Sequence, residues 1–190
     1  CGKAVPFRAD EPSAIAKQPQ SGPVAVNALG LVGDQQADPV HHGGPDMALH
    51  HYPRDHYADW AGFLGNHALL RGEAAFGENL SASGLTETKA CIGDRFRLGS
   101  ALVEISQGRK PCWKLDHRFA KPGLAAEVVR TGRAGWYYRV IESGQIAAGD
   151  RLELVDRPHP QWTVARVFTL IVAGGHKSDP AAIHALVGLK

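Results

Sequence analysis

The stretch IGDRFRLGSALVEIS, residues 92–106, decides the fold class of this chain. Gly93 and Asp94 precede a run of alternating polar and apolar residues, and the alternation resumes from Leu102 to Ser106. A glycine–aspartate pair in front of such a run is typical of a hairpin corner that leads into a half-buried strand. The stretch therefore predicts short β-strands joined by tight turns.

Residues 148–155, AGDRLELV, repeat this pattern, and β-type segments follow one another from Phe76 onward. The chain has 22 glycines and 12 prolines among 190 residues, a rich supply of turn formers. Short strands at this density predict a closed or nearly closed β-barrel. The expected fold class is mainly β, of the α+β type, with peripheral helices such as residues 55–65, for which Asp55 is the expected N-cap.

The pattern changes to helical near residue 158. Residues 163–175 predict one helix that ends at two glycines, and residues 179–188 predict a second helix that begins with Asp179 and Pro180. The expected organisation is a barrel domain over residues 1–157 and a small helical module over residues 158–190.

Composition limits the functional classes. The formal net charge of +2 lacks the basic excess of a dedicated nucleic-acid binder, so no direct nucleic-acid binding is expected. The sequence contains no apolar run of the ~18 residues that a membrane helix needs, so no membrane partner is expected. Its three cysteines form no CxxC pair and indicate no disulfide framework. With no secretory leader at the start of this sequence, a cytoplasmic location is expected.

The segment SQGRKPCWKLDHRF, residues 106–119, is the best candidate for chemistry. Positive charge near a thiol favours the thiolate, which is the nucleophilic and metal-binding form. Here Cys112 has basic neighbours, which are also candidate anchors for a phosphate or another anion. These neighbours are Arg109, Lys110, Lys114 and Arg118. A solvated loop without function is the alternative interpretation of the same pattern.

Several motifs, in this order, resemble the MOSC domain family, which is named after the C-terminal domain of molybdenum cofactor sulfurases. The resemblance extends from about Pro12 to beyond Trp162, and its YiiM-like branch carries a three-helix module after the barrel. The motifs are GLVGDQQAD (30–38), HHGGPDMALHHYPRDHY (41–57), FGENLS (76–81), CIGDRFRLG (91–99), SQGRKPCWKL (106–115) and TGRAGWYYRV (131–140).

The resemblance implies a β-barrel that binds a molybdenum–pterin cofactor, with Cys112 as the protein ligand to molybdenum. A soft thiolate suits a metal already bound by dithiolene sulfurs. The family's Gly-Glu-Asn motif places Asn79 at the pocket, with Glu78 beside it as a candidate acid. The basic residues Arg109, Lys110 and Lys114 are then expected to anchor the cofactor. Pyridoxal phosphate binding and a detoxification role are further expectations attached to the family.

Relatives in this family reduce N-hydroxylated compounds, including hydroxylamino-purines, to amines. The implied activity is therefore that of a molybdenum-dependent oxidoreductase on a small N-hydroxylated substrate. Its electrons are expected from a separate flavoprotein or iron–sulfur partner, and a homodimer is the expected assembly.

Five histidines lie between residues 41 and 56, without the HExxH spacing of a zinc site. We expect His42, Gly43 and Gly44 to form a wall of the cofactor pocket, since glycine lets backbone N–H groups approach an anion. His51, with His50 and Tyr52, is a candidate to supply a proton. Exposed or capping histidines are the alternative. Asp34 and Asp38 are expected to be turn or capping residues.

Two rival functions stay open at this point. In the first, Cys112 carries sulfur as a persulfide and the protein handles the molybdenum cofactor without redox turnover. In the second, the barrel only binds an anionic ligand and performs no chemistry.

Overall fold

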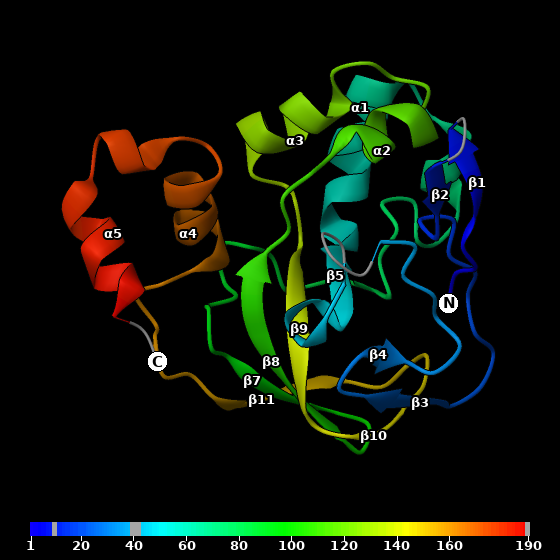
Figure 1. Ribbon diagram of the computed structural model, residues 1–190, viewed down its shortest axis with the longest axis horizontal. Coiled ribbons are helices and arrows are strands. Elements are labelled where there is room, and N and C mark those ends of the chain that lie inside the picture. The colour runs from blue at the N-terminus through cyan, green and yellow to red at the C-terminus, as the bar shows by residue number, and fades with distance from the viewer. Residues whose placement is uncertain (9–10, 39–42, 189–190) are drawn as a thin grey trace.

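The structure, a computed structural model, describes residues 1–8, 11–38 and 43–188. Its centre is a curled six-stranded sheet, a half-barrel (Figure 1). The strands pair antiparallel except for β5 and β6, which are parallel. In spatial order they are β11 (Leu152–Asp156), β7 (Arg95–Leu98), β8 (Ala101–Gly108), β9 (Trp136–Glu142), β5 (Leu49–Pro53) and β6 (Leu80–Ala82).

Two smaller β-units complete the β-structure. A three-stranded sheet has the order β10-β3-β4, and an N-terminal hairpin pairs β1 with β2. These strands are β10 (Gly144–Ile146), β3 (Val24–Asn27), β4 (Gly30–Leu31), β1 (Val5–Arg8) and β2 (Glu11–Ser13). Together with the helices, they confirm the predicted α+β class with a curled, barrel-like sheet.

The decisive stretch forms β7 and β8. In β7 the alternation predicted from the sequence is observed, since Phe96 and Leu98 are buried and Arg95 is exposed. In contrast, all five residues from Ala101 to Ile105 of β8 are buried, including Glu104. The reason is the tertiary structure: β8 lies between β7 and β9, and helix α4 packs against it.

Three helices gather over one end of the sheet: α1 (Tyr57–Leu64), α2 (Trp113–Arg118) and α3 (Leu124–Thr131) (Figure 1). Their apolar side chains form a core with Tyr52, Phe76 and Phe168. Asp55 is not the N-cap of α1, because a 3₁₀ turn (Arg54–His56) precedes the helix and the Asp55 carboxylate accepts a hydrogen bond from Gly84 N.

The C-terminal helices are α4 (Val164–Ile171) and α5 (Pro180–Val187), at the side of the sheet. Thr163 and Asp179 cap them through their side chains, which confirms both predicted helix starts. Val164 and Phe168 of α4 pack into the cores of the preceding part of the chain, and the division at residue 157 stays a prediction. In the described part of the chain, no helix has the length and apolarity that crossing a membrane requires.

A glycine fixes the entry to β9. Gly135 has φ of +72°, and a Cβ there would lie 2.2 Å from the backbone oxygen of His51. We expect Gly135→Ala to lower the free energy of unfolding by roughly 3 kcal/mol, through a strained φ and a backbone clash. Gly132→Ala is the matched control, because φ is +69° with open space around it, and about 1 kcal/mol is expected. Equal losses in denaturant unfolding would contradict the clash.

Candidate functional site

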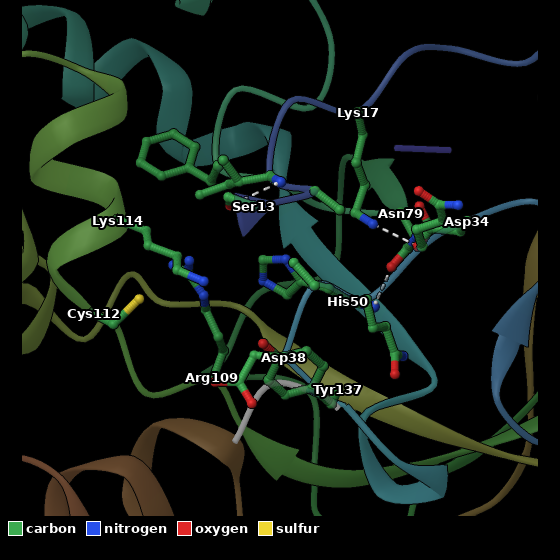
Figure 2. Close-up of a pocket in the computed structure, with 17 residues that line it drawn as sticks. Ser13, Lys17, Asp34, Asp38, His50, Asn79, Arg109, Cys112, Lys114 and Tyr137 are labelled. Atoms are coloured by element: carbon green, nitrogen blue, oxygen red, sulfur yellow. Dashed lines mark hydrogen bonds and ion pairs between the residues drawn. The ribbon is translucent and has the colours of Figure 1, made fainter. Parts of the chain in front are cut away.

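A cavity of about 110 Å³ brings together residues that are far apart in the sequence. It lies between the N-terminal hairpin, β5, β9 and the connection from β8 to α2 (Figure 2). Its polar lining residues are Ser13, Lys17, Asp34, Gln35, Gln36, Asp38, His50, Asn79, Arg109, Cys112, Lys114 and Tyr137.

Cys112 reaches this cavity because β8 ends at Gly108 and the chain then turns into α2. Arg109 N donates to Gly135 O at 3.0 Å, which holds the connection against β9. Cys112 is the N-cap residue of α2 and is partly buried. In Figure 2 its sulfur points toward the space that the neighbouring basic side chains border. The sequence prediction of a cysteine with basic neighbours agrees with this placement.

Two buried nitrogen atoms in the cavity wall have no hydrogen-bond partner among the described residues. They are Arg109 Nη1 and His50 Nε2, and the two residues are only 6% and 5% exposed. A buried polar atom without a partner is costly, so each such atom in a folded protein calls for an explanation. An anionic or polar ligand in the cavity would supply the missing partners.

The His50 ring is neutral near pH 7. Burial, and next the positive charge of Arg109, lower the pKa of His50 well below its ordinary value. His50 was a candidate to supply a proton, which requires a group that titrates near neutrality. With its pKa lowered well below the ordinary value, His50 does not meet this requirement. It offers the cavity an uncharged imidazole nitrogen instead.

A second group of polar residues forms the opposite wall. Lys17 Nζ contacts Asp34 Oδ2 at 2.5 Å, and Asn79 Nδ2 donates to the same oxygen at 2.8 Å. Asn79 Oδ1 accepts a hydrogen bond from His50 N at 3.0 Å, and Asn79 N donates to His50 O at 2.8 Å. The predicted pocket residue Asn79 therefore lies at the cavity, where it connects the two walls (Figure 2).

Tyr137 of β9 borders the cavity beside Arg109. Burial raises the pKa of its hydroxyl, and the charge of Arg109 with a side-chain hydrogen bond opposes this shift. Lys114 of α2 also borders the cavity, and its Nζ donates to Pro12 O at 3.5 Å. Of the four predicted anion anchors, Arg109 and Lys114 border the cavity, whereas Arg118 does not.

His51 does not reach this cavity, because it alternates with His50 along β5 and points to the other side of the strand. Its ring stacks on Trp136 with centroids 4.3 Å apart, and Nδ1 lies 3.2 Å from Tyr138 Oη. Burial lowers the pKa of His51 to about 3. A neutral, fully buried ring has no proton to give near pH 7, so the expected acid role of His51 is not supported.

The buried His51 has a consequence for stability at low pH. Its pKa is about 3 in the folded chain and about 6.5 when unfolded, so protons bind the unfolded state preferentially between these values. The contribution of His51 to the free energy of unfolding is therefore fully present above pH 6.5 and decreases as the pH falls. At pH 5 about 2 kcal/mol of it is lost.

We therefore expect His51→Gln to reduce the difference in unfolding free energy between pH 7 and pH 5 by about 2 kcal/mol. Denaturant unfolding at the two pH values measures this difference. His184→Gln, at an exposed position of α5, is the control and should leave it unchanged. An unaltered pH dependence in His51→Gln would argue against a neutral buried ring.

Two other predicted site residues also lie elsewhere. Lys110 is exposed and does not border the cavity. Glu78 is 2% exposed, accepts hydrogen bonds from Tyr57 Oη at 2.5 Å and Phe76 N at 3.0 Å, and borders a neighbouring cavity of about 450 Å³. Burial raises the pKa of Glu78. Neither residue is therefore brought together with Cys112.

The wall predicted from His42, Gly43 and Gly44 lies only partly within the described residues. His42, with His41, lies outside the described residues. Gly43 and Gly44 are described and do not border the cavity, and Gly44 N donates to Gln36 Oε1 at 3.4 Å. Of the remaining candidates, His56 pairs with Glu87 at 2.7 Å and Tyr52 donates its hydroxyl hydrogen to Arg133 O.

Several polar residues of the site were not predicted from the sequence, among them Lys17, Asp34 and Tyr137. Lys17 and Tyr137 carried no signal beyond a lone lysine and an aromatic residue in apolar surroundings. Asp34 follows a glycine, and this pairing favoured a turn. The turn exists, since Asp34 N donates to Leu31 O at 3.0 Å, but its carboxylate faces the cavity wall.

The side chains of the cavity fit a metal ion whose ligands come mostly from a cofactor and not from the protein. No group of three His, Cys, Asp or Glu side chains in the described parts of the chain is arranged to hold a metal ion. One thiol beside unpartnered nitrogen donors and lysines instead suits an anionic organic cofactor with a soft metal. The residues present therefore fit a molybdenum–pterin group.

Comparisons with known proteins agree with this architecture. The model of the family described as MOSC domain matches residues 38–153. Protein YiiM of Escherichia coli is 47% identical over 156 residues, which are 82% of this chain and 70% of that protein. A protein of Gibberella moniliformis named Reductase is 43% identical over 162 residues, 85% of this chain but only 29% of that protein.

Solved structures show the same fold. YiiM from Geobacillus stearothermophilus superposes with a TM-score of 0.77 at 34% identity, covering 93% of this chain and 80% of that chain. YiiM from Escherichia coli superposes with a TM-score of 0.73 at 42% identity, covering 82% of this chain and 72% of that chain. The chain belongs to the MOSC domain family, in its YiiM-like branch.

Proposed function

We propose that this chain is a molybdenum-cofactor-dependent reductase that converts N-hydroxylated compounds to amines, with Cys112 as the protein ligand to molybdenum. The MOSC domain is associated with molybdenum cofactor binding, and a relative named Reductase supports oxidoreductase activity. The hydroxylamino-purine class of substrate follows from the family resemblance and belongs to the proposal.

One observation carries the proposal. The Cys112 thiol shares a cavity with Arg109 Nη1 and His50 Nε2, two buried nitrogens without hydrogen-bond partners in the described structure. If the cavity held no ligand, these unpartnered buried atoms would lower the free energy of unfolding. A bound cofactor would supply them with acceptors through its phosphate and pterin oxygens and with donors through its pterin N–H groups.

The reaction R-NHOH + 2e⁻ + 2H⁺ → R-NH₂ + H₂O defines what the site must do. The cofactor, when bound, supplies the two electrons at the metal. Arg109 and Lys114 would bind its anionic groups, and Asn79 would hold His50 in the wall. Lys17 and Lys114, which border the cavity, are the proposed proton donors.

The remaining parts of the proposal concern the surroundings of the enzyme. We propose that a separate flavoprotein or iron–sulfur protein donates the electrons and that the chain forms a homodimer. A cytoplasmic location, a detoxification role and pyridoxal phosphate binding gain no support from the relatives' names, and they stay predictions.

The test uses protein produced in a host that makes the molybdenum cofactor. With chemically reduced methyl viologen as electron donor, 6-hydroxylaminopurine should be converted to adenine, with two viologen electrons consumed for each adenine formed. Chromatography of the purines and viologen absorbance measure the two quantities. Protein with one molybdenum per chain that forms no amine would overturn the reductase proposal.

The same preparation distinguishes the two rival functions. A sulfur carrier would show an added mass of one sulfur atom on Cys112 in intact-protein mass spectrometry, in molybdenum-free protein. An anion-binding module would keep its ligand affinity in Cys112→Ser. Neither result is expected from a reductase whose thiol is a metal ligand.

A further inference from the structure

Asp34 connects parts of the cavity wall that are distant in the sequence. Its side chain is 7% exposed and accepts hydrogen bonds from Gly2 N at 2.6 Å and from Asn79 Nδ2 at 2.8 Å, and it pairs with Lys17 Nζ at 2.5 Å. One carboxylate therefore joins the N-terminal segment, the turn after β4 and the loop before β6.

The position of the Lys17 ammonium depends on this carboxylate. The Lys17 side chain is 10% exposed, and a buried ammonium is costly unless a partner of opposite charge compensates it. A lysine side chain also has several rotatable bonds, so only a fixed partner keeps its Nζ at one place. Asp34 is that partner at the edge of the cavity.

The orientation of the Asn79 amide depends on it as well. The oxygen and the nitrogen of an asparagine amide are nearly equal in size, and only the hydrogen-bond partners distinguish them. His50 N can only donate and the Asp34 carboxylate can only accept, so a single orientation satisfies both. In that orientation, Asn79 holds the His50 backbone on the cavity wall.

We propose that Asp34 is a positioning residue of the site: its carboxylate fixes the Lys17 ammonium and the orientation of the Asn79 amide toward His50. The role in turnover rests on the proposed reductase function, whereas the role in holding the side chains does not. Asp34→Asn keeps the size of the side chain and removes its charge, so it tests both.

Asp94 offers a matched control. It is also buried, accepts hydrogen bonds from Arg157 Nε and Nη2 at 2.9 and 2.8 Å and from Cys91 N at 2.9 Å, and does not border the cavity. Asp94→Asn therefore removes a similarly bonded carboxylate with a similar loss of ion pairing. It is expected to lower stability without changing the site.

The first measurement needs no cofactor. In ¹⁵N-labelled protein, the side-chain amide signals of Asn79, assigned from their loss in Asn79→Ser, should shift and lose protection from hydrogen exchange in Asp34→Asn. They should stay unchanged in Asp94→Asn. Unchanged Asn79 signals in folded Asp34→Asn would overturn the proposal, whatever reaction the protein catalyses.

The second measurement is turnover per bound molybdenum with 6-hydroxylaminopurine. We expect kcat to fall on the order of tenfold in Asp34→Asn, as for a displaced positioning group, and to remain at the wild-type value in Asp94→Asn. Equal kcat values for both variants would overturn the role in turnover. A wild-type enzyme without turnover would instead contradict the proposed function, and the amide signals would still decide the positioning role.

Discussion

Cys112→Ser is expected to lose its molybdenum. Removing groups that only support a metal ligand lowers metal affinity by about 10–100-fold, so removing the ligand itself should cost more than about 100-fold. A serine hydroxyl is a harder and far less acidic ligand than a thiol, and it does not replace a soft thiolate. Elemental analysis of purified protein should give near one molybdenum per chain for wild type and almost none for the variant.

Cys91→Ser is the control for this experiment. Cys91 is buried, and its Sγ donates to Pro160 O at 3.5 Å, away from the cavity. Its replacement should retain the metal, since a serine hydroxyl can make the same hydrogen bond. Equal molybdenum contents in Cys112→Ser and wild type would show that Cys112 does not determine cofactor binding.

The second large effect is expected at Arg109. Its guanidinium lies buried in the cavity wall with Nη1 unpartnered among the described residues. A hydrogen bond from a charged donor to an anionic cofactor is worth about 2 kcal/mol, so Arg109→Gln should bind the cofactor roughly 30-fold more weakly. Fluorescence of the oxidised pterin extracted after dialysis measures how much cofactor each variant retains.

Lys110→Gln removes the same charge from the next residue, which is exposed and outside the cavity. It should retain as much cofactor as wild type. The cofactor-free Arg109→Gln protein should be at least as stable as wild type, because a buried charge that lacks a full set of partners is removed. Equal cofactor losses in the two variants would mean that only the general positive charge of this segment matters.

These variants separate residues that look alike in the sequence. The run from Arg109 to Lys114 predicted a thiol surrounded by cations, and no local pattern indicated which cations face inward. The position at which β8 ends decides this orientation. Directly after Gly108, Arg109 is buried in the cavity wall and Lys110 is exposed to solvent. The presence of a basic site was predictable, whereas its inner members were not.

The histidines give the same lesson for a strand. His50 and His51 are equivalent by composition, but they lie on opposite sides of β5, so one borders the cavity and the other packs on Trp136. The prolines on either side, Pro45 and Pro53, disfavour a helix but fix neither the strand nor its register. Only pairing with β6 and β9 decides which histidine points inward.

Long-range contacts set the remaining limit. Turn chemistry and alternation predicted β7, and residues typical of helix ends predicted α4 and α5. Together these local patterns predicted the α+β class. The contacts of Asp34 with Lys17 and Asn79 span 17 and 45 residues, and they depend on how β4, the N-terminal segment and the loop before β6 come together. No local pattern contains that information.

X-ray absorption at the molybdenum K-edge of wild type and of the small cofactor-loaded fraction of Cys112→Ser tests the central claim most directly. If Cys112 binds the metal, wild type should show one more sulfur neighbour at molybdenum than the variant does. An identical number of sulfur neighbours in the two proteins would contradict the assignment of Cys112 as the protein ligand.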